Sequence, residues 1–230
     1  MKKNVMMRVA SVLLVAVMLT TCVISGTFAK YVTSGNSFDS ARVAKWGVAI
    51  EARGTTFATE YDTDDALVSG VISKSVISSD SSNLVAPGTT GTLAESVITG
   101  TPEVAVNVKY EATLDISGSW TDGSEEYFPV YFTVGGRTFG TDDSGLGFDV
   151  TCANIAELET AVNNAIAAYS ANYNPNTNLS TTTPLAVTWN WAFSTSAEND
   201  VRDTYLGNLA ANDNPGIITL AIITTVTQID

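Results

Sequence analysis

The feature that most constrains the fold is a long alternation of apolar and polar residues over Glu103–Ser117. Successive side chains of a β-strand point to opposite faces of the sheet, so this alternation predicts a long strand with one buried face. Such a strand needs neighbouring strands and a second layer to cover its apolar face. The residues on that face are Val104, Val106, Val108, Tyr110, Ala112, Leu114 and Ile116.

Shorter strand patterns, separated by turn residues, occupy most of the remaining chain. Gly135 and Gly136 lie between two apolar runs, and two glycines in this position are typical of a tight hairpin turn. The last run, 217–229, is apolar on both faces, which predicts a central strand that is covered on both sides. In the first run, Trp46 shares one face with Val48 and Ile50 and is expected in the core. The predicted strands are 42–52, 67–77, 93–99, 103–117, 127–134, 137–139, 185–193 and 217–229.

One helix is predicted between these strands. Asn154 and Glu157 have the spacing of a capping box, in which each side chain bonds a free backbone N–H of the first turn. Apolar residues then recur at intervals of three and four up to Tyr169, which places them on one helix face. The sequence therefore predicts an all-β fold, a β-sandwich of jelly-roll or Greek-key type, with one inserted α-helix at about 154–171.

The composition excludes several classes of function. The chain has 24 acidic and 11 basic residues and a net charge of −13, so it repels phosphate backbones and we expect no nucleic-acid partner. It contains no histidine, which excludes Ser-His-Asp triads and histidine-bound zinc. Without a histidine to act as its base, Cys152 is expected to be a buried apolar side chain. We therefore predict no catalytic residue, no cofactor and no enzymatic activity.

Residues 1–29 have the parts of a secretory signal peptide. A short basic segment precedes the apolar run 9–24, and small residues then end at Ala29. This order predicts cleavage between Ala29 and Lys30. The alternative is a retained membrane anchor, because 9–29 is just long enough to span a bilayer. Without residues 1–29 the chain keeps 8 basic and 24 acidic residues, so its net charge becomes −16.

Two groups of side chains are candidates for ligand binding. Carboxylates on loops bind Ca²⁺, but none of the acidic clusters matches the EF-hand pattern. Solvated loops are therefore the simpler interpretation, and weak Ca²⁺ binding is the alternative. Trp189 and Trp191 share one strand face and are expected in the core rather than on a sugar-binding platform. The carboxylates that would bind Ca²⁺ are those of Asp62, Asp64, Asp65, Asp142 and Asp143.

Three parts of the chain resemble the TasA and camelysin-like family of secreted proteins, whose signal peptides are of the SipW-dependent type. Segment Gly26–Val48 is similar to the family's cleavage motif, Ser/Asp-rich stretch and first strand. The turn Asn83–Gly88 is similar to its N-L-x-P-G turn. Residues 187–193 and 199–207 look like a tryptophan-rich strand and loop of clostridial members. The resemblance does not account for the helix predicted at 154–171.

The resemblance implies a secreted structural protein of the cell surface or biofilm matrix, with a jelly-roll-like domain at 42–230. In fibre-forming members the freed N-terminal segment completes the sheet of the next subunit. The corresponding segment here is Lys30–Ala41, with Tyr31, Val32 and Phe38 as candidate plugs. Folding back on its own sheet and disorder are the alternatives for this segment.

The partners implied are further copies of the chain, a signal peptidase of the SipW type and other matrix proteins. The alternative function belongs to a different class. It is a monomeric extracellular adhesion or ligand-binding module that holds sugar or Ca²⁺ on its acidic loops.

Overall fold

The computed structural model describes residues 5–18, 42–53, 57–63, 70, 72–142, 146–182, 185–193 and 195–229. The chain divides into two units, Met1–Val43 and Ala44–Asp230. In the first unit, residues 5–18 form a helix whose side chains are exposed. No helix within the described ranges has both the length and the apolar character that a membrane span requires. The predicted cleavage site Ala29–Lys30 and the segment 30–41, including Tyr31, Val32 and Phe38, lie outside the described residues.

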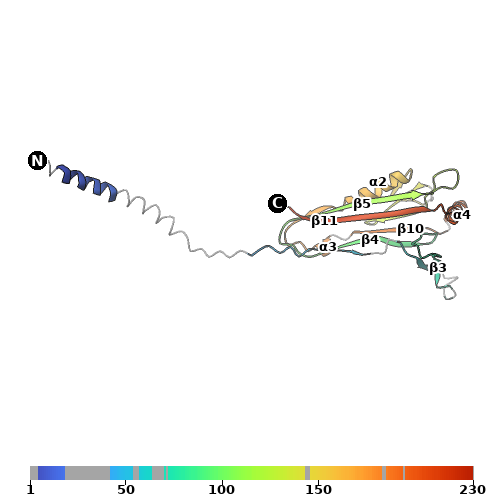
Figure 1. Cartoon of the computed structure of the whole chain (residues 1–230). Coiled ribbons are helices and arrows are strands. Elements are labelled where there is room, and N and C mark those ends of the chain that lie inside the picture. Colours follow the sequence, from blue (N-terminus) through green and yellow to red (C-terminus); the bar gives the residue numbers. More distant parts are fainter. Residues whose placement is uncertain are drawn as a thin grey trace. The chain divides into compact units, whose positions relative to one another are not determined.

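The second unit is rich in β-strands, as the alternating patterns predict (Figure 1). One sheet has the strand order β1-β4-β10-β6-β7-β8, a second has the order β11-β5-β9, and β2 pairs with β3. The pairing of β7 with β8 is parallel and the other strand pairs are antiparallel. The strands are β1 (Ala49–Arg53), β2 (Glu60–Asp62), β3 (Lys74–Ile77), β4 (Thr90–Thr99), β5 (Val106–Gly118), β6 (Val130–Val134), β7 (Arg137–Thr141), β8 (Val150–Cys152), β9 (Ala171–Tyr173), β10 (Leu185–Trp191) and β11 (Gly216–Gln228).

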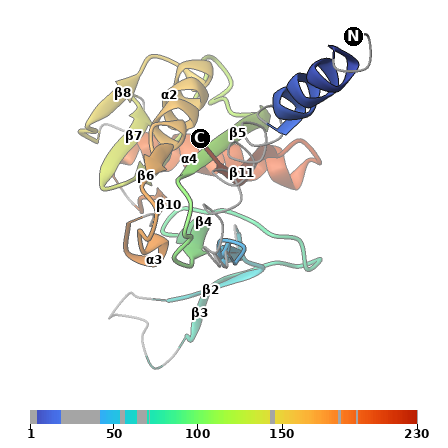
Figure 2. The same ribbon diagram turned by 90° about the vertical axis from the view of Figure 1, so that its left-hand side faces the viewer.

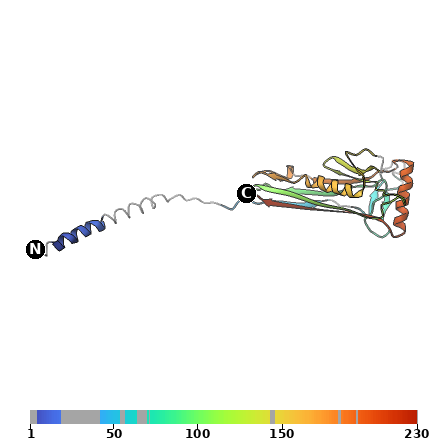
Figure 3. The same ribbon diagram turned by 90° about the horizontal axis from the view of Figure 1, so that it is seen from above.

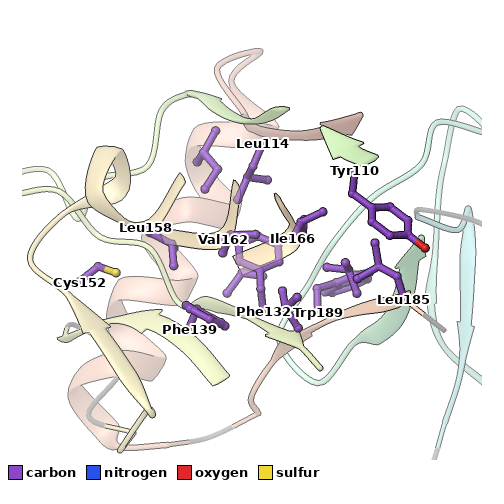
Figure 4. Close-up of a cluster of buried hydrophobic side chains, with 14 of the residues drawn as sticks. Tyr110, Leu114, Phe132, Phe139, Cys152, Leu158, Val162, Ile166, Leu185 and Trp189 are labelled. Atoms are coloured by element: carbon purple, nitrogen blue, oxygen red, sulfur yellow. The ribbon is translucent and has the colours of Figure 1, made fainter. Parts of the chain in front are cut away.

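The long alternation predicted a strand correctly, because β5 buries alternate residues along its length. Its buried face shares one apolar core with the inward faces of β6 and β10. Trp189 belongs to this core (Figure 4), and the centre of its ring lies 5.2 Å from that of Phe57. The predicted burial of Trp189, Trp191 and Cys152 is confirmed, since each side chain is at most 5% exposed.

The predicted inserted helix is α2 (Ile155–Ala167), and it begins where the capping residue lies. The Oδ1 atom of Asn154 accepts a hydrogen bond from the backbone N–H of Glu157 at 2.9 Å. The buried residues Leu158, Val162 and Ile166 form its inner stripe and point into the common core (Figure 4). The helix packs along β5 and against β6, β7 and β8 (Figure 2).

Helix α2 and the residues that follow it cover one edge of β5. Strand β9 pairs with β5 only over Val106–Val108. Beyond that point, side-chain oxygens of Ser170, Asn163 and Glu159 accept the backbone N–H groups of β5 residues 110, 114 and 116, at 2.9, 2.8 and 2.6 Å. Side chains thereby supply the acceptors that a neighbouring strand would otherwise provide.

The prediction of a single inserted helix is wrong, because the second unit also contains α3 (Leu179–Thr182) and α4 (Ala197–Ala211). Helix α4 includes residues 199–207, which had resembled a loop. Ser196 caps it by accepting the backbone N–H of Asn199 at 3.1 Å. Only Asn199 and Leu206 are buried in this helix, so its sequence carries no apolar stripe from which a helix could be predicted.

The first predicted strand is shorter than expected. Gly47 has a φ of +54°, which interrupts the extended backbone, and β1 begins only at Ala49. Gly47 lies against Gly100, where a Cβ atom would come within 2.1 Å of the Gly47 carbonyl oxygen. Trp46 lies before this bend and is 41% exposed, so the expectation that it belongs to the core is wrong.

Candidate functional site

Strand β11 lies at the end of its sheet, so the prediction of a central strand covered on both sides is wrong. Along its whole length it pairs with β5 on one side, and no described strand pairs with its other side. On its outer face, Ile217 and Ile223 are 50% and 62% exposed. Its inner face is only half-buried. The chain therefore places apolar residues on both faces of an edge strand.

The inner face of β11 is less well covered than the strand it pairs with. Ile218 pairs with Ile116 of β5, and Leu220 pairs with Leu114. Directly paired residues share one face of a sheet, so these residues belong to the same layer. The two β5 residues are at most 8% exposed, whereas their β11 partners are only half-buried. The inward-facing β11 residues, called the open edge below, are Ile218, Leu220, Ile222 and Val226.

The backbone of these same residues points away from β5. The backbone N–H groups of β5 residues 110, 114 and 116 point to the α2 side. Backbone groups alternate in direction along a strand, so the N–H and C=O groups of the odd-numbered β5 residues point toward β11. The hydrogen bond from the Ile229 N–H to the Ala105 carbonyl likewise joins two odd-numbered residues. Residues of the open edge are paired with even-numbered residues of β5, so their N–H and C=O groups lie on the far side of β11. An edge of this kind is a template for pairing with another strand.

The six-stranded sheet also has a poorly covered strand. Strand β11 approaches β4, and β1 lies next to β4 at the edge of the six-stranded sheet. Ile50 of β1 is paired with Ile98 of β4 and so points to the same face. Ile98 is 1% exposed, whereas Ile50 is 44% exposed. Side chains at the margin of the common core are therefore less buried along β1 and along β11 than on β4 and β5.

A pocket of about 490 Å³ lies at the end where β11 begins. Its walls come from the loop 83–87, from α4 and from the first residues of β11, and α4 lies across this end of the unit (Figure 3). Three aromatic rings and several aliphatic side chains make the pocket mainly apolar. The lining residues that matter below are Phe57, Trp120, Trp191, Asp203, Gly207 and Ile218.

Asp203 supplies the carboxylate of this pocket. Its Oδ1 atom accepts hydrogen bonds from the Tyr127 hydroxyl at 2.7 Å and from Nε1 of Trp191 at 3.3 Å. Burial raises the pKa of Asp203 above its ordinary value, and the two hydrogen bonds oppose that shift. The Arg202 guanidinium lies 3.9 Å from the centre of the Tyr127 ring and pairs with Asp122 at 2.9 Å. This network holds the acidic wall of the pocket in place.

The raised pKa of Asp203 leads to a testable pH dependence. A carboxyl whose pKa is higher in the folded state stabilises the fold at low pH, and this stabilisation is lost as the pH rises through the folded-state pKa. Asp203→Asn removes the titration and keeps an acceptor for the Tyr127 hydroxyl. Between pH 3 and pH 7 we expect the stability of the wild type, measured by urea unfolding, to decrease relative to that of this variant. Asp213→Asn, at an exposed turn, is the control and should follow the wild type; equal behaviour of both variants would contradict the assignment.

The predicted Ca²⁺ ligands are not brought together by the described residues. Asp62 lies on β2, where the Lys74 ammonium contacts its carboxylate at 2.5 Å and that of Glu60 at 3.1 Å. Asp142 is exposed, and Asp64, Asp65 and Asp143 lie outside the described residues. Within the part of the chain that the structure describes, no three His, Cys, Asp or Glu side chains are placed to hold a metal ion. Ca²⁺ binding on these loops stays a prediction.

Other loop carboxylates stabilise turns. Asp122 accepts the backbone N–H groups of Glu125 and Ser124, each at 2.9 Å, and these bonds lower its pKa. Asp149 accepts the backbone N–H of Thr138 at 2.9 Å, and its pKa is lowered for the same reason. The carboxylates of Asp122 and Asp149 therefore serve local structure.

The pocket could not be predicted from the sequence. Asp203 and its partner Tyr127 are 76 residues apart, and no motif connects them. Trp120, whose exposure the sequence could not predict, is 6% exposed, and its ring meets that of Phe128 edge-on at 4.7 Å. No protein-family model, curated protein or solved structure matches this chain. The open edge and the pocket beside it are therefore the candidate functional features of the described residues.

Proposed function

We propose that this chain is a secreted structural protein of the bacterial cell surface or biofilm matrix, and that copies of it assemble by strand addition. The observation that supports this proposal best is the open edge of β11. There, a 13-residue strand directs backbone hydrogen-bonding groups away from its partner, while Ile218, Leu220, Ile222 and Val226 stay half-covered. An added strand would satisfy the backbone groups and bury the apolar ones in one step.

We further infer that the fold is a β-sandwich of the jelly-roll or Greek-key type. Two observations favour this architecture. The inward faces of β5, β6 and β10 share one core. The six-stranded sheet places β10 between β4 and β6, so strands distant in sequence are neighbours, as the connections of such folds require. In this architecture β11 is the last strand of one layer, and that layer ends before it fully covers the apolar core.

The segment that would occupy the open edge is Lys30–Ala41 of another copy. It has twelve residues against the 13 residues of β11, so its length matches that of the strand it would pair with. Tyr31, Val32 and Phe38 provide apolar side chains for the uncovered layer. The resemblance to fibre-forming secreted proteins supports the same arrangement. The partners are then further copies of the chain, a signal peptidase of the SipW type that cuts between Ala29 and Lys30, and other matrix proteins.

The test compares two chains that differ only in this segment. The chain Lys30–Asp230 is expected to form filaments, and the chain Arg42–Asp230 is expected to remain a folded monomer. Light scattering and negative-stain microscopy follow assembly, and circular dichroism confirms that both chains are folded. Stable monomers from both chains would contradict the proposal. Filaments from both would show that the assembly contact lies outside residues 30–41.

A monomeric extracellular ligand-binding module is the second candidate, and the aromatic pocket favours it. Phe57, Trp120 and Trp191 line a cavity large enough for a small ligand, and Asp203 adds a polar group. A binding module would stay monomeric with or without residues 30–41. Its ligand affinity would instead fall when Trp120 is replaced by alanine, which separates the two candidates.

A further inference from the structure

The pocket and the open edge form one continuous surface. Ile218 belongs to both, since it lines the pocket and is the first inward-facing side chain of the open edge. The pocket lies at the end where β11 begins. A segment paired with the edge of β11 that faces away from β5 would therefore end beside the pocket.

The chain enters the second unit at the opposite end of β11. The Lys45 carbonyl accepts the N–H of Glu103 at 3.0 Å, and the Ala105 carbonyl accepts the N–H of Ile229 at the same distance. Lys45 is thus close to the last residues of β11, whereas α4 and the pocket lie at the other end (Figure 3). A segment preceding Arg42 that paired with its own β11 would therefore have its last residues at the end of β11 that lies away from the pocket.

This placement links the direction of an added strand to the kind of assembly. A segment that folds back on its own β11 runs parallel to it, and so does a segment exchanged reciprocally between two copies. A segment that enters a second copy from the pocket end runs antiparallel to that copy's β11. Antiparallel ladders are slightly more stable per residue, and head-to-tail contacts that do not close produce filaments. The antiparallel direction excludes both fold-back and reciprocal exchange and leaves head-to-tail contacts, so it is the direction that favours filament growth.

We propose that the segment Lys30–Ala41 of a second copy lies antiparallel along β11 and places the Phe38 side chain in the pocket. This inference rests on the proposed self-assembly by strand addition. In the antiparallel direction the later residues of the segment lie at the pocket end, so Phe38 is its large apolar residue nearest to the pocket. The pocket offers the rings of Trp120, Trp191 and Phe57, and aromatic rings pack favourably against one another.

One register of the added strand brings Phe38 to the pocket and another apolar side chain to the uncovered layer of β11. With Phe38 opposite Gly216, Val32 lies opposite Ile222, and both side chains point to the uncovered layer because directly opposed residues share a face. Gly216 has no side chain there, and the Trp120 ring lies over it, since a Cβ atom would come within 2.3 Å of that ring. The space opposite Gly216 thus adjoins an aromatic wall.

Cysteine pairs test the direction in the chain Lys30–Asp230. The proposed register places Ser37 opposite Ile217, on the exposed face, at a non-hydrogen-bonded position with about 4.5 Å between the Cα atoms. S37C combined with I217C is expected to give disulfide-linked multimers under mild oxidation. The control pair S37C with I223C is expected to give none, and Cys152 is buried in both proteins. Linkage of the control pair alone, or linkage within single chains, would overturn the antiparallel proposal.

Two substitutions at one position test the pocket. Gly207 lines the pocket on α4, and a Cβ atom added there meets nothing within 4 Å, so a side chain is accommodated. Gly207→Phe is expected to fill the pocket and prevent filament formation, whereas Gly207→Ala should assemble like the parent chain. Phe38→Ala is expected to raise the critical concentration about 10- to 100-fold, because a buried ring is lost.

The outcomes separate this inference from the function on which it rests. If Gly207→Phe and Phe38→Ala assemble as readily as the parent chain while the chain Arg42–Asp230 does not, the pocket inference is wrong and strand addition stands. If the parent chain itself does not assemble, the proposed function fails. Circular dichroism of each variant confirms that a loss of assembly is not a loss of folding.

Discussion

Replacing Ile222 by lysine is expected to abolish assembly and to leave a folded monomer. Ile222 lies on the inner face of β11, opposite Ala112 of β5, and is only half-buried. In the monomer a lysine here extends its ammonium group along the uncovered layer into water. An added strand would bury that charge without a partner, at a cost of several kcal/mol. Inward-pointing charges of this kind are also how natural edge strands avoid pairing.

The matched control is Ile223→Lys, the same change at the next residue. Ile223 is 62% exposed on the outer face of β11, so its replacement changes the composition and net charge equally. We expect this variant to form filaments like the parent chain in light scattering and sedimentation. Assembly of both variants, or of neither, would show that the inner face of β11 is not the contact.

The sequence predicted β11 as a strand but not its place in the fold. Apolar residues on both faces of 217–229 indicate that both faces are covered, and a central position is the usual way to achieve this. In the structure one face carries exposed Ile217 and Ile223, and the other is half-buried. The apolar pattern did not reveal that the described part of the chain leaves both faces of β11 incompletely covered. Under the proposed function, another copy supplies the strand that covers the inner face.

Local signals explain which other elements could be predicted. The strand β5 and the helix α2 bury residues at regular intervals of sequence, so periodicity identifies them. Helix α4 buries only Asn199 and Leu206, and its local signals are limited to its start, with the cap at Ser196 and the acidic residues Glu198 and Asp200 in the first turn. The pocket depends on contacts such as that of Asp203 with Tyr127, which only the folded chain brings together. Regular burial was therefore readable from the sequence, and the candidate site was not.

Replacing both Glu159 and Asn163 by alanine is expected to lower the free energy of unfolding by about 2–5 kcal/mol. Their oxygens accept the backbone N–H groups of Ile116 and Leu114, two β5 residues that are at most 8% exposed. A buried donor left without a partner costs about 1–3 kcal/mol. Alanine's better helix propensity returns only a few tenths of a kcal/mol per position. Urea unfolding of the chain Lys30–Asp230 under monomeric conditions measures the difference.

Glu159→Gln is the control, because it keeps an acceptor oxygen at nearly the same place and should lose much less stability than the double variant. A loss below about 0.5 kcal/mol in the double variant would show that water replaces these side chains without cost. The comparison also bears on assembly. Helix α2 occupies one side of β5 beyond the short pairing with β9, so that side of β5 is closed to an added strand while β11 stays open. If the double variant exposes the second side as well, it should form irregular aggregates where the parent chain forms filaments, because an exposed edge accepts strands without a fixed direction.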